Sequence, residues 1–413
     1  MIRYWTAGES HGKGHIAFLD SFPAGVFVDK ASIDSELRRR QGGYGRGGRQ
    51  KIETDEVEVL TGVWHDVTIG SPVVLWVKNR DSKINDMPDL NAPRPGHGDL
   101  AGMMKYHTGI RPILERASAR GTTALVAAGA LAKLLLAEFD ICVVAYVLAI
   151  GELSLEPEVA DSKVADSKAG ESKVGDFLRK SASVSEKQTC LVQEIIELRN
   201  KSKFYSLCPD RDEEAKQLVD QCRENGNTLG GVVEVRVDGV PFGLGTHAQW
   251  DLKLDGRLAQ AVMALQSVKG VEIGIGFQSA RRFGQDVHDP IVYDASPWNR
   301  RSFGFSRTSN NAGGIEAGMS NSEQIVVRAS LKPIATLRAA LPSVDWKTMQ
   351  PASASYERSD VCAVPAASVV LEAIVALEIA TALTEKFGSD SVEEMKAFYR
   401  SFGEIAKQRF CRM

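Results

Sequence analysis

The sequence has no strong net charge and no long hydrophobic run. Lys and Arg number 50 against 53 Asp and Glu, which leaves a net charge of -3. No global positive field therefore exists to hold a nucleic-acid backbone, and any anion site must be local. No apolar run approaches the roughly 18 residues of a membrane span, and the N-terminal segment contains no apolar signal-peptide core. These absences predict a cytoplasmic protein that binds neither nucleic acid nor membranes.

Motifs of several common enzyme classes and metal sites are missing too. The six cysteines are scattered without a CxxC pair, which predicts reduced buried thiols instead of a disulfide frame or a zinc site. The chain contains no Walker loop and no Gly-x-Ser-x-Gly elbow, and the dinucleotide fingerprint at 274–276 is incomplete. His11 and His15 are four residues apart, but the glycines between them argue against a helix that would present both to a metal. We therefore expect no metal site.

What is present is the composition of an ordinary globular protein, with 43% hydrophobic and 25% charged residues. The first hundred residues predict strands and loops, because short apolar runs are broken by Gly and Pro. Beyond them the pattern predicts helices at 111–139, 212–224, 255–265, 361–386 and 392–409, and strands at 141–150, 231–240, 271–276 and 324–329. The helices at 111–139 and 361–386 are apolar on most sides, which suggests a helical layer covered on both sides by sheet.

A charged five-residue repeat occupies 159–173 and contains no aromatic residue. Such a segment cannot bury a core, so we interpret about 155–188 as a low-complexity surface insertion. No linker inside 189–413 invites a division of the chain. We therefore expect a single catalytic domain over 1–413.

The densest chemical signal is the segment 38–49, with five arginines and five glycines in twelve residues. Glycine lets backbone approach a ligand closely, and arginine offers a planar fork for carboxylate or phosphate. Three interpretations remain open: a disordered tract that binds RNA, a solvated charged loop, and an ordered anion-binding loop. The strand-like alternation that follows at 51–60 favours the ordered loop.

Two histidines have surroundings that suit acid–base chemistry. His11 lies among small residues and His97 between glycines in a proline-stiffened loop, so both rings can be reached, although a structural histidine is the alternative for each. Four arginines in small-residue settings together indicate a ligand with several negative charges: Arg94, Arg116, Arg120 and Arg358. The loop 310–314 and the run 332–336 suit a flat ring and a phosphate, with a tight turn between strands as the alternative for the loop.

Several of these segments resemble one known family. Gly8-Glu9-Ser10-His11-Gly12 looks like the first signature of the chorismate synthases. The segments 114–120 (Leu-Glu-Arg-Ala-Ser-Ala-Arg) and 358–366 (Arg-Ser-Asp-Val-Cys-Ala-Val-Pro-Ala) look like the second and third. Between them, 94–97, 310–314 and 332–333 follow in the order of the family. The likeness covers essentially the whole chain except about 152–200.

The resemblance implies a reaction, a cofactor and a fold. Chorismate synthases convert 5-enolpyruvylshikimate 3-phosphate to chorismate and phosphate in the shikimate pathway of aromatic amino acid biosynthesis. They require reduced FMN although the reaction has no net redox change, and NADPH is a candidate reductant. The substrate carries two carboxylates and a phosphate, which matches the arginines noted above. The implied fold is an α+β, single-domain β-α-β sandwich, with helices packed between two antiparallel sheets, and the implied assembly is a homotetramer.

The resemblance also implies roles for individual residues. His11 would protonate the departing phosphate, His97 would protonate the reduced flavin ring, and Asp360, assisted by Ser118, would act as base through the flavin. The substrate anions would contact Arg40, Arg46, Arg49, Arg94, Arg120 and Arg358. FMN would contact Arg116, Ala117, Ser118, Gln266, Ser267, Ala317, Lys332, Pro333, Ile334, Ala335, Thr336 and Arg358.

Three places depart from the family pattern. Gly121 follows Arg120 where Glu is usual, the 105–111 loop is one residue shorter, and Ala317 stands where Gly is usual. The first two lie beside the expected flavin and substrate loop, so a reduced rate or an altered loop geometry is one expectation. The proposed proton-transfer residues remain, and we predict an active enzyme. The alternative is a non-catalytic anion- or RNA-binding protein that uses the loop 38–49.

Overall fold

The computed structural model describes residues 1–47, 53–157, 186–294, 301–357 and 359–410. Within these ranges the chain forms helices and several antiparallel sheets, so the expected α+β class is confirmed. The repeat at 159–173 lies outside the described residues, as do Arg49 and Arg358. Predictions that rest on them stay predictions.

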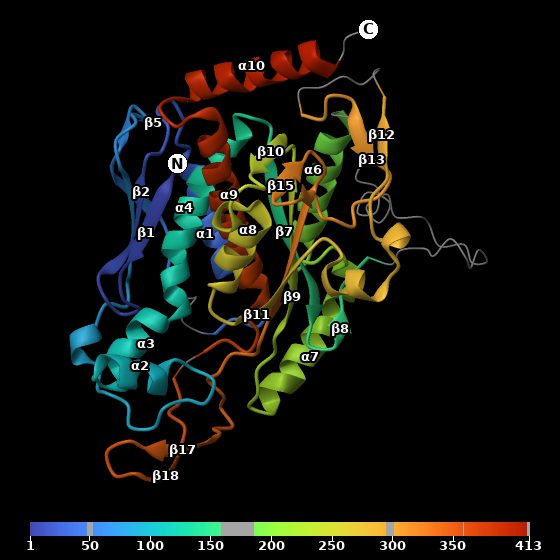
Figure 1. Ribbon diagram of the computed structural model, residues 1–413. Coiled ribbons are helices and arrows are strands. Elements are labelled where there is room, and N and C mark those ends of the chain that lie inside the picture. Colours follow the sequence, from blue (N-terminus) through green and yellow to red (C-terminus); the bar gives the residue numbers. More distant parts are fainter. Residues whose placement is uncertain (48–52, 158–185, 295–300, 358, 411–413) are drawn as a thin grey trace.

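Two antiparallel sheets lie on opposite sides of a layer of helices (Figure 1). The first has the order β1 (Arg3–Ala7), β2 (Gly14–Asp20), β6 (Val73–Lys78) and β3 (Val57–Thr61). The second has the order β11 (Val268–Ile273), β16 (Ile325–Leu331), β9 (Gly231–Asp238), β7 (Cys142–Ile150) and β8 (Leu153–Ser154). Smaller sheets join β10 (Phe242–Gly245), β15 (Met319–Asn321) and β14 (Ile315–Glu316), and pair β12 (Ile291–Tyr293) with β13 (Phe305–Arg307), β17 (Pro342–Asp345) with β18 (Gln350–Ser353), and β4 (Val63–Trp64) with β5 (Val67–Thr68).

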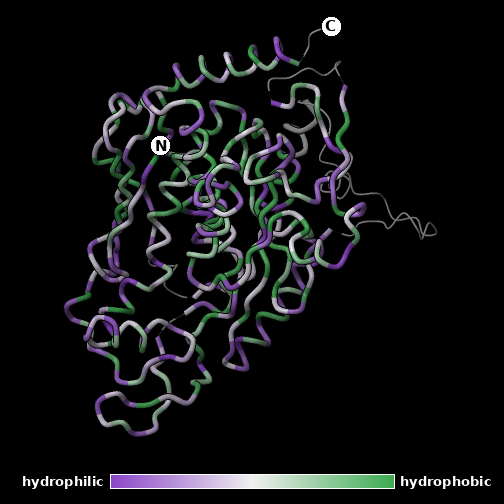
Figure 2. The backbone as a smooth tube through the Cα atoms, in the orientation of Figure 1, coloured by the Kyte–Doolittle hydropathy of each residue, from purple (hydrophilic) through white to green (hydrophobic). Residues whose placement is uncertain are grey.

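The helices are distributed between the central layer and the rim. Their bounds are α1 (Lys30–Gln41), α2 (Asp99–Tyr106), α3 (Ile110–Ala117), α4 (Thr122–Ala137), α6 (Glu186–Lys201), α7 (Asp212–Glu224), α8 (Leu254–Met263), α9 (Val364–Phe387) and α10 (Val392–Phe410). In the centre, α4 packs on β2 and β6, α9 packs on β7 and β9, and the two helices pack on each other. The hydropathy of this central region can be followed in Figure 2.

The central helices correct one expectation from the sequence. By length and composition, Ile110–Ala137 and Val364–Phe387 are both apolar enough to cross a membrane. The expectation that no apolar run approaches the length of a membrane span is therefore wrong. Their most apolar windows are 72% and 89% buried inside the protein. Burial of this kind is typical of core helices that are apolar all round because they pack on every side.

The first hundred residues contain the helix α1 and the start of α2, where strands and loops are expected. The carboxylate of Asp29 accepts the N–H of Ala31 at 3.0 Å and so caps α1. Ile33 and Leu37, one turn apart, are both fully buried. Residues 38–41 form the last turn of this helix, so the first part of the Arg/Gly segment is helical and only 42–47 is a described loop.

The helix expected at 111–139 is interrupted at Ser118. This residue is extended (φ -68°, ψ 142°), and a short 3-10 turn, η3 (Ala119–Gly121), separates it from α4. The Ser118 hydroxyl accepts the N–H of Arg120 at 3.3 Å and starts the new turn. The helix α6 was not expected, while the other predicted elements agree with the structure to within a few residues.

Gly129 lies where α4 crosses α9, and it makes a close approach possible. A Cβ at position 129 would lie 2.3 Å from the Cβ and 2.5 Å from the Cα of Ala373. Replacing Gly by Ala in a helix interior usually gains about 1 kcal/mol. Here the new Cβ would collide with backbone atoms of Ala373, which cannot move aside easily. We therefore expect the overpacking cost of about 1–3 kcal/mol to exceed the gain.

Urea denaturation should therefore show a lower free energy of unfolding for Gly129→Ala than for the natural protein. The matched control is Gly256→Ala in α8, where the new Cβ would meet its nearest atom at 3.7 Å. The control should leave stability unchanged or raise it. Equal stability of the two variants would contradict the close helix crossing.

Candidate active site

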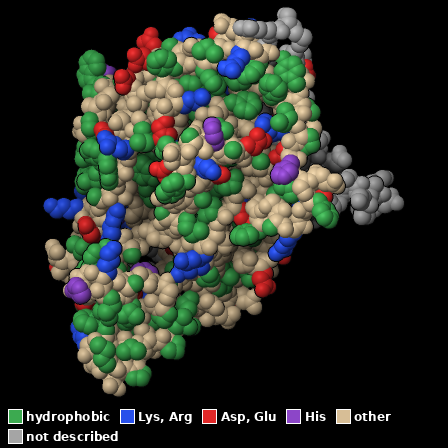
Figure 3. Space-filling view, in the orientation of Figure 1, with side chains coloured by type: hydrophobic (Ala, Val, Ile, Leu, Met, Phe, Trp, Pro, Cys, Tyr) green, Lys and Arg blue, Asp and Glu red, His purple; other side chains and the backbone are tan. Residues whose placement is uncertain are grey.

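A pocket of about 700 Å³ lies where loops from the N-terminal sheet, the α3–α4 junction and the start of α9 meet. Its volume is within the range of small-molecule sites. It is lined by six cations (Arg40, Arg46, Lys83, Arg94, Arg120 and Lys332), three carboxylates (Asp81, Glu357 and Asp360) and two histidines (His11 and His97). In the space-filling view a hollow opens on the drawn face, with cationic side chains near its edge (Figure 3).

The pocket brings together most of the residues predicted from the sequence. The residues expected to transfer protons all line it: His11, His97, Ser118 and Asp360. Among the expected substrate contacts, Arg40, Arg46, Arg94 and Arg120 line it. Among the expected FMN contacts, Ala117, Ser118, Gln266, Ser267, Lys332, Ile334, Ala335 and Thr336 line it.

Three of the expected FMN contacts are not brought to this pocket. The guanidinium of Arg116 instead donates to the carbonyl oxygen of Thr6 at 2.9 Å, beside β1. Ala317 lies in the turn between β14 and β15 with φ 50°. Pro333 follows Lys332 but is not among the lining residues. These three residues do not line the pocket, and their contact with FMN stays a prediction.

His11 is held by a buried carboxylate from α3. Its Nδ1 lies 2.9 Å from Oε1 of Glu115, and its backbone N–H donates to Oε2 at 2.7 Å. Burial alone would raise the pKa of the Glu115 carboxyl, but hydrogen bonds from His11 and the charge of Arg111 lower it below its usual value. The other ring nitrogen, Nε2, lies 3.9 Å from the carboxylate of Asp81, which also lines the pocket.

His97 has a comparable partner at the start of α2. Its Nδ1 lies 2.6 Å from Oδ1 of Asp99, and both oxygens of that carboxylate also accept from Arg94, at 2.8 and 2.9 Å. Asp99 is fully buried. Burial opposes ionisation, but the bonds from His97 and Arg94 hold the pKa of Asp99 well below its usual range. Arg94 reaches onward to the hydroxyl of Thr336 at 2.9 Å.

Arg40 and Arg120 share a single buried carboxylate. Asp55 accepts from Arg40 at 2.7 Å and from Arg120 at 2.6 Å. Burial, together with repulsion from Arg120 and Arg46, lowers the pKa of Arg40 to about 10, against the opposing attraction of Asp55. Within the described residues, the buried Nε atoms of Arg40 and Arg46 have no hydrogen-bond partner. Unsatisfied guanidinium N–H donors in a buried cluster favour a bound anion.

Arg46 connects the segment after α1 to the segment before α9. Its guanidinium pairs with the carboxylate of Asp360, whose other oxygen accepts the N–H of Gly47 at 2.6 Å. A Cβ at Gly47 would lie 2.9 Å from the carbonyl oxygen of Ser359, so only glycine permits this contact. The pairing places Asp360 at the pocket wall.

The opposite wall combines apolar and hydroxyl groups. The N–H of Lys332 donates to the carbonyl oxygen of Ser267 at 2.9 Å, which joins the two segments expected to hold FMN. Ser267 has φ 77°, a conformation that turns the chain sharply beside the pocket. Leu265 and Ala335 add apolar surface. A flat apolar ring with a polar end fits such a wall.

The loop 310–314, a second candidate for a flat ring, does not line the pocket. The N–H groups of Asn311 and Ala312 donate to the carboxylate of Asp289 at 2.8 and 2.9 Å, and Gly313 and Gly314 have positive φ. This geometry fits the alternative of a tight turn. In the part of the chain that the structure describes, no three His, Cys, Asp or Glu side chains gather as metal ligands do.

Sequence reasoning missed the carboxylates that position the site: Asp55, Asp99 and Glu115. Asp99 is two residues from His97, and Glu115 lies inside the second family signature, so both had a local signal. Asp55 had none, because it is 15 residues from Arg40 and 65 from Arg120. Only the fold brings these groups together.

Comparison with known proteins identifies the family. A family model described as chorismate synthase matches residues 2–384. The chorismate synthase of Geobacter sulfurreducens is 46% identical over 421 residues, which cover 98% of this chain and 100% of the relative. That of Enterococcus faecalis is 47% identical over 410 residues, with coverages of 96% and 97%. A solved structure titled as the crystal structure of chorismate synthase superposes with a TM-score of 0.76 at 38% identity, covering 98% of each chain. The chain belongs to the chorismate synthase family.

Proposed function

We propose that this protein is an active chorismate synthase, a carbon–oxygen lyase that eliminates phosphate from 5-enolpyruvylshikimate 3-phosphate to give chorismate. The observation that carries the proposal is one pocket in which His11 and His97 share a space with four arginines. The 1,4-elimination removes phosphate from one ring carbon and hydrogen from another. It therefore requires a proton donor, a base and cations around the leaving anion, and the pocket offers all three kinds of group.

The arginines suit a substrate with several negative charges. Arg40 and Arg120 both bind Asp55. Arg120 also lies 3.5 Å from Glu53, so carboxylates of the protein balance both charges. The Nε donor of Arg40 has no partner among the described residues, and such donors suit the oxygens of a carboxylate or a phosphate. Arg46 and Arg94 extend the cationic wall on either side. Guanidinium groups held by buried partners lose little conformational freedom on binding, which favours affinity.

The proposed proton transfers follow from how the side chains are held. Because Nδ1 of His11 faces Glu115, the ring donates from Nε2 to an oxygen of the departing phosphate. Asp360 is the carboxylate base, with Ser118 beside it in the same pocket. His97, held by Asp99, keeps a proton on the cofactor side of the pocket.

We propose reduced FMN as the cofactor, held by Ser267, Lys332 and Thr336 with the apolar side chains beside them. Bound there, reduced FMN would supply electron density that helps phosphate leave and would recover it as the hydrogen departs, so that no net redox change occurs. The hydroxyl and ammonium groups suit its phosphate. The wall of Leu265 and Ala335 suits its ring.

An anaerobic assay with chemically reduced FMN and the enolpyruvyl substrate tests the proposal. Phosphate and chorismate should form in equal amounts, and oxidised FMN should give neither. No phosphate release with reduced FMN would overturn the proposal. An aerobic assay with NADPH as sole reductant then tests NADPH, since turnover under those conditions requires the protein to reduce its own flavin.

Arg46→Ala should raise KM for the substrate by about 10- to 100-fold, because one charge-assisted hydrogen bond contributes about 1.5–3 kcal/mol. The effect on kcat should be smaller, since the expected contact exists in the bound ground state as well. Steady-state phosphate release measures both. Arg38→Ala is the matched control, because Arg38 is exposed at the C-terminal end of α1 and does not line the pocket. An unchanged KM in Arg46→Ala would contradict the assignment.

The RNA-binding alternative has less support. Arg39, Arg40 and Arg46 point inward to carboxylates of Glu372, Asp55 and Asp360. Their side chains are at most 10% exposed, so an extended phosphate backbone cannot reach them, whereas a small anion can enter the pocket that Arg40 and Arg46 line.

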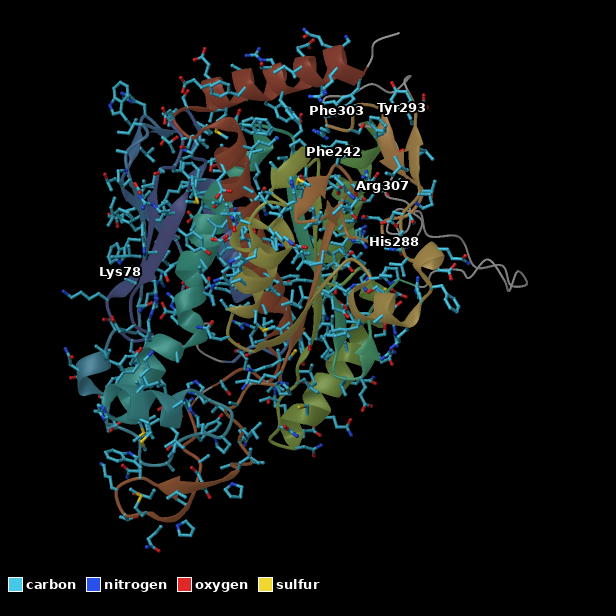
Figure 4. The ribbon with its side chains drawn as sticks, viewed as in Figure 1. Lys78, Phe242, His288, Tyr293, Phe303 and Arg307 are labelled. Atoms are coloured by element: carbon cyan, nitrogen blue, oxygen red, sulfur yellow. The ribbon has the colours of Figure 1, made fainter. Side chains whose placement is uncertain are left out.

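We also propose a homotetramer in the cytoplasm. The segment 276–293 exposes large apolar side chains, with Phe277 73%, Phe283 80% and Ile291 64% exposed. Figure 4 shows Tyr293 at the outer edge of the same region. Apolar surface of this extent is typical of protein interfaces. Light scattering should give the mass of four chains, and a stable monomer would refute the assembly.

We propose further that the layered arrangement is the β-α-β sandwich of the family and that 1–413 forms one catalytic domain. Two features support this proposal. The two large sheets cover the same pair of helices, α4 and α9. The proposed site draws its walls from segments between Ser10 and Val370, so no part of the chain holds it alone.

A further inference from the structure

We infer that Glu115 is a positioning residue for His11, whose carboxylate holds the proton of the neutral ring on Nδ1 and directs Nε2 toward the pocket. The inference rests on the proposed function, since His11 serves the departing phosphate there. It adds a residue that acts through His11 and does not itself line the pocket. His11 makes three contacts with the Glu115 carboxylate, one from its backbone and two from its ring, and nearby charges hold that carboxylate ionised.

The backbone of His11 is fixed on both sides, so its ring orientation is set by what the ring meets. Its N–H donates to Oε2 of Glu115 at 2.7 Å, and its carbonyl oxygen accepts from Lys83 and Ile84 at 3.0 and 3.1 Å. The ring Nδ1 lies 2.9 Å from Oε1 and 3.1 Å from Oε2 of the same carboxylate. An ionised carboxylate only accepts hydrogen bonds, so Nδ1 must carry a proton.

The surrounding charges keep this arrangement in place. Arg111 lies 3.6 Å from Oε1 of Glu115 and favours its ionised form. On the other side of the ring, Asp81 is 3.9 Å from Nε2, which is too far for a hydrogen bond, and Lys83 pairs with Asp81 at 3.0 Å. Nε2 is therefore directed at a space where a ligand oxygen can accept its proton.

His97 shows the same design independently. Asp99 accepts from its Nδ1 at 2.6 Å and shares its oxygens with Arg94, as Glu115 shares its charge between His11 and Arg111. Both proposed proton-transfer histidines thus have a buried carboxylate at Nδ1 and an arginine beside that carboxylate. The two sites differ in one respect, because Nη2 of Arg94 also lies 3.1 Å from Nδ1 and 3.3 Å from Nε2 of His97. The repetition argues that the arrangement serves proton transfer and is more than local packing.

Glu115→Gln tests the inference because an amide cannot satisfy both donors. The backbone N–H of His11 can only donate, so the amide oxygen should take that bond. The amide nitrogen then faces Nδ1, which must become an acceptor. The neutral ring should switch to the Nε2–H tautomer, and the protonated ring should lose its anionic partner and bind its proton less tightly.

Nitrogen NMR of protein labelled with ¹⁵N-histidine reads the tautomer and titration of His11 directly. The protein contains seven histidines, and the His11→Ala spectrum assigns the resonance. The natural protein should show Nδ1–H in the neutral form. Glu115→Gln should show Nε2–H in the neutral form, and its ring should lose the second proton at lower pH because the anionic partner is gone.

The same change should appear in the pH profile of phosphate release. The proposed role needs protonated His11, so kcat/KM is lost as pH rises through the titration of that ring. In Glu115→Gln this loss should begin at lower pH, because the ring has lost its anionic partner, and KM should change less than kcat. If Glu115 had a purely structural role, Glu115→Gln would lower the free energy of unfolding without moving the pH profile of phosphate release.

Glu234→Gln is the matched control. Glu234 is also buried and pairs with Arg236 and Arg328 at 2.6 Å each, and it lies on β9 away from the pocket lining. This variant should lose stability while the His11 resonance and the pH profile stay in place.

Two results would overturn the inference. One is an Nε2–H ring at His11 in the natural protein, which decides the question even if Glu115→Gln does not fold. The other is a folded Glu115→Gln whose His11 tautomer and titration match the natural protein. The spectra are recorded on the resting protein, so they separate a failure of this inference from a failure of the proposed enzyme activity, which the phosphate assay detects.

Discussion

His11→Ala and His97→Ala are each expected to lower turnover by about 10²- to 10⁴-fold, the usual contribution of a positioned acid or base. Alanine removes the ring but leaves Glu115 and Asp99 with their backbone and arginine hydrogen bonds, so the protein should remain folded. Single-turnover phosphate release under reduced conditions measures the effect on the chemical step.

The two substitutions should differ in what else they change. His11 is proposed to act on the substrate phosphate, so adding a weak external acid should restore part of the lost rate in His11→Ala. His97 is proposed to face the cofactor, so the same addition should help less there. His247→Ala is the control, because His247 is exposed and does not line the pocket. A normal rate in either pocket variant would remove that histidine from its proposed role.

Glu372→Ala should lower the free energy of unfolding by about 3–5 kcal/mol, the cost of leaving buried charges without their partner. Glu372 lies on α9 and is 1% exposed. It binds Arg39 of α1 at 2.6 Å, Lys133 of α4 at 2.5 Å and Arg199 of α6 at 3.1 Å. One carboxylate therefore holds three helices to a fourth.

The effect of Glu372 should depend on pH. Burial would raise the pKa of Glu372, but Arg39, Lys133 and Arg199 outweigh it and hold the pKa well below the usual value of 4.5. A carboxyl with a depressed pKa stabilises the folded state above its unfolded pKa and loses that contribution as the pH falls. The difference in stability between the natural protein and Glu372→Ala should thus be full near pH 7 and should shrink below about pH 4.5.

Glu378→Ala on the same helix is the matched control. Burial raises the pKa of Glu378, and Arg257 at 3.4 Å only partly opposes this shift. Its ionised form therefore costs stability as the pH rises through its titration, so the dependence should have the opposite sign. If the stability difference from the natural protein changed with pH in the same direction for both variants, the assignment of Glu372 as the shared partner of Arg39, Lys133 and Arg199 would be contradicted.

Long periodic elements could be predicted from the sequence, and short ones could not. The helices α7 and α10 and the strand β7 were predicted within two residues, because their apolar periodicity extends over several turns or a whole strand. The helix α1 was missed because three arginines and the following glycines dominate its C-terminal end. Its signals were present in the Asp29 cap and the spacing of Ile33 and Leu37.

The site shows why residue types alone do not assign contacts. Arg38, Arg39 and Arg40 are consecutive, but helical rotation of about 100° per residue sends them in three directions. Arg38 faces solvent, Arg39 reaches the core carboxylate of Glu372, and Arg40 enters the pocket. Motif likeness could name Arg40 as a substrate contact. The structural role of Arg39 required the position of α9, more than 300 residues further along the chain.

The position of α9 between the two sheets also shapes how the protein is made. This helix is translated only after the strands and the helix α4 that pack around it, and the N–H of Ile2 reaches across to the hydroxyl of Thr384 at 3.4 Å. Contacts between segments so far apart in the sequence raise the contact order. They slow folding, because long loops must close before these contacts can form. The faces of α4, β7 and β9 that pack on α9 therefore stay open while most of the chain leaves the ribosome, and the nascent protein should depend on chaperones during that interval.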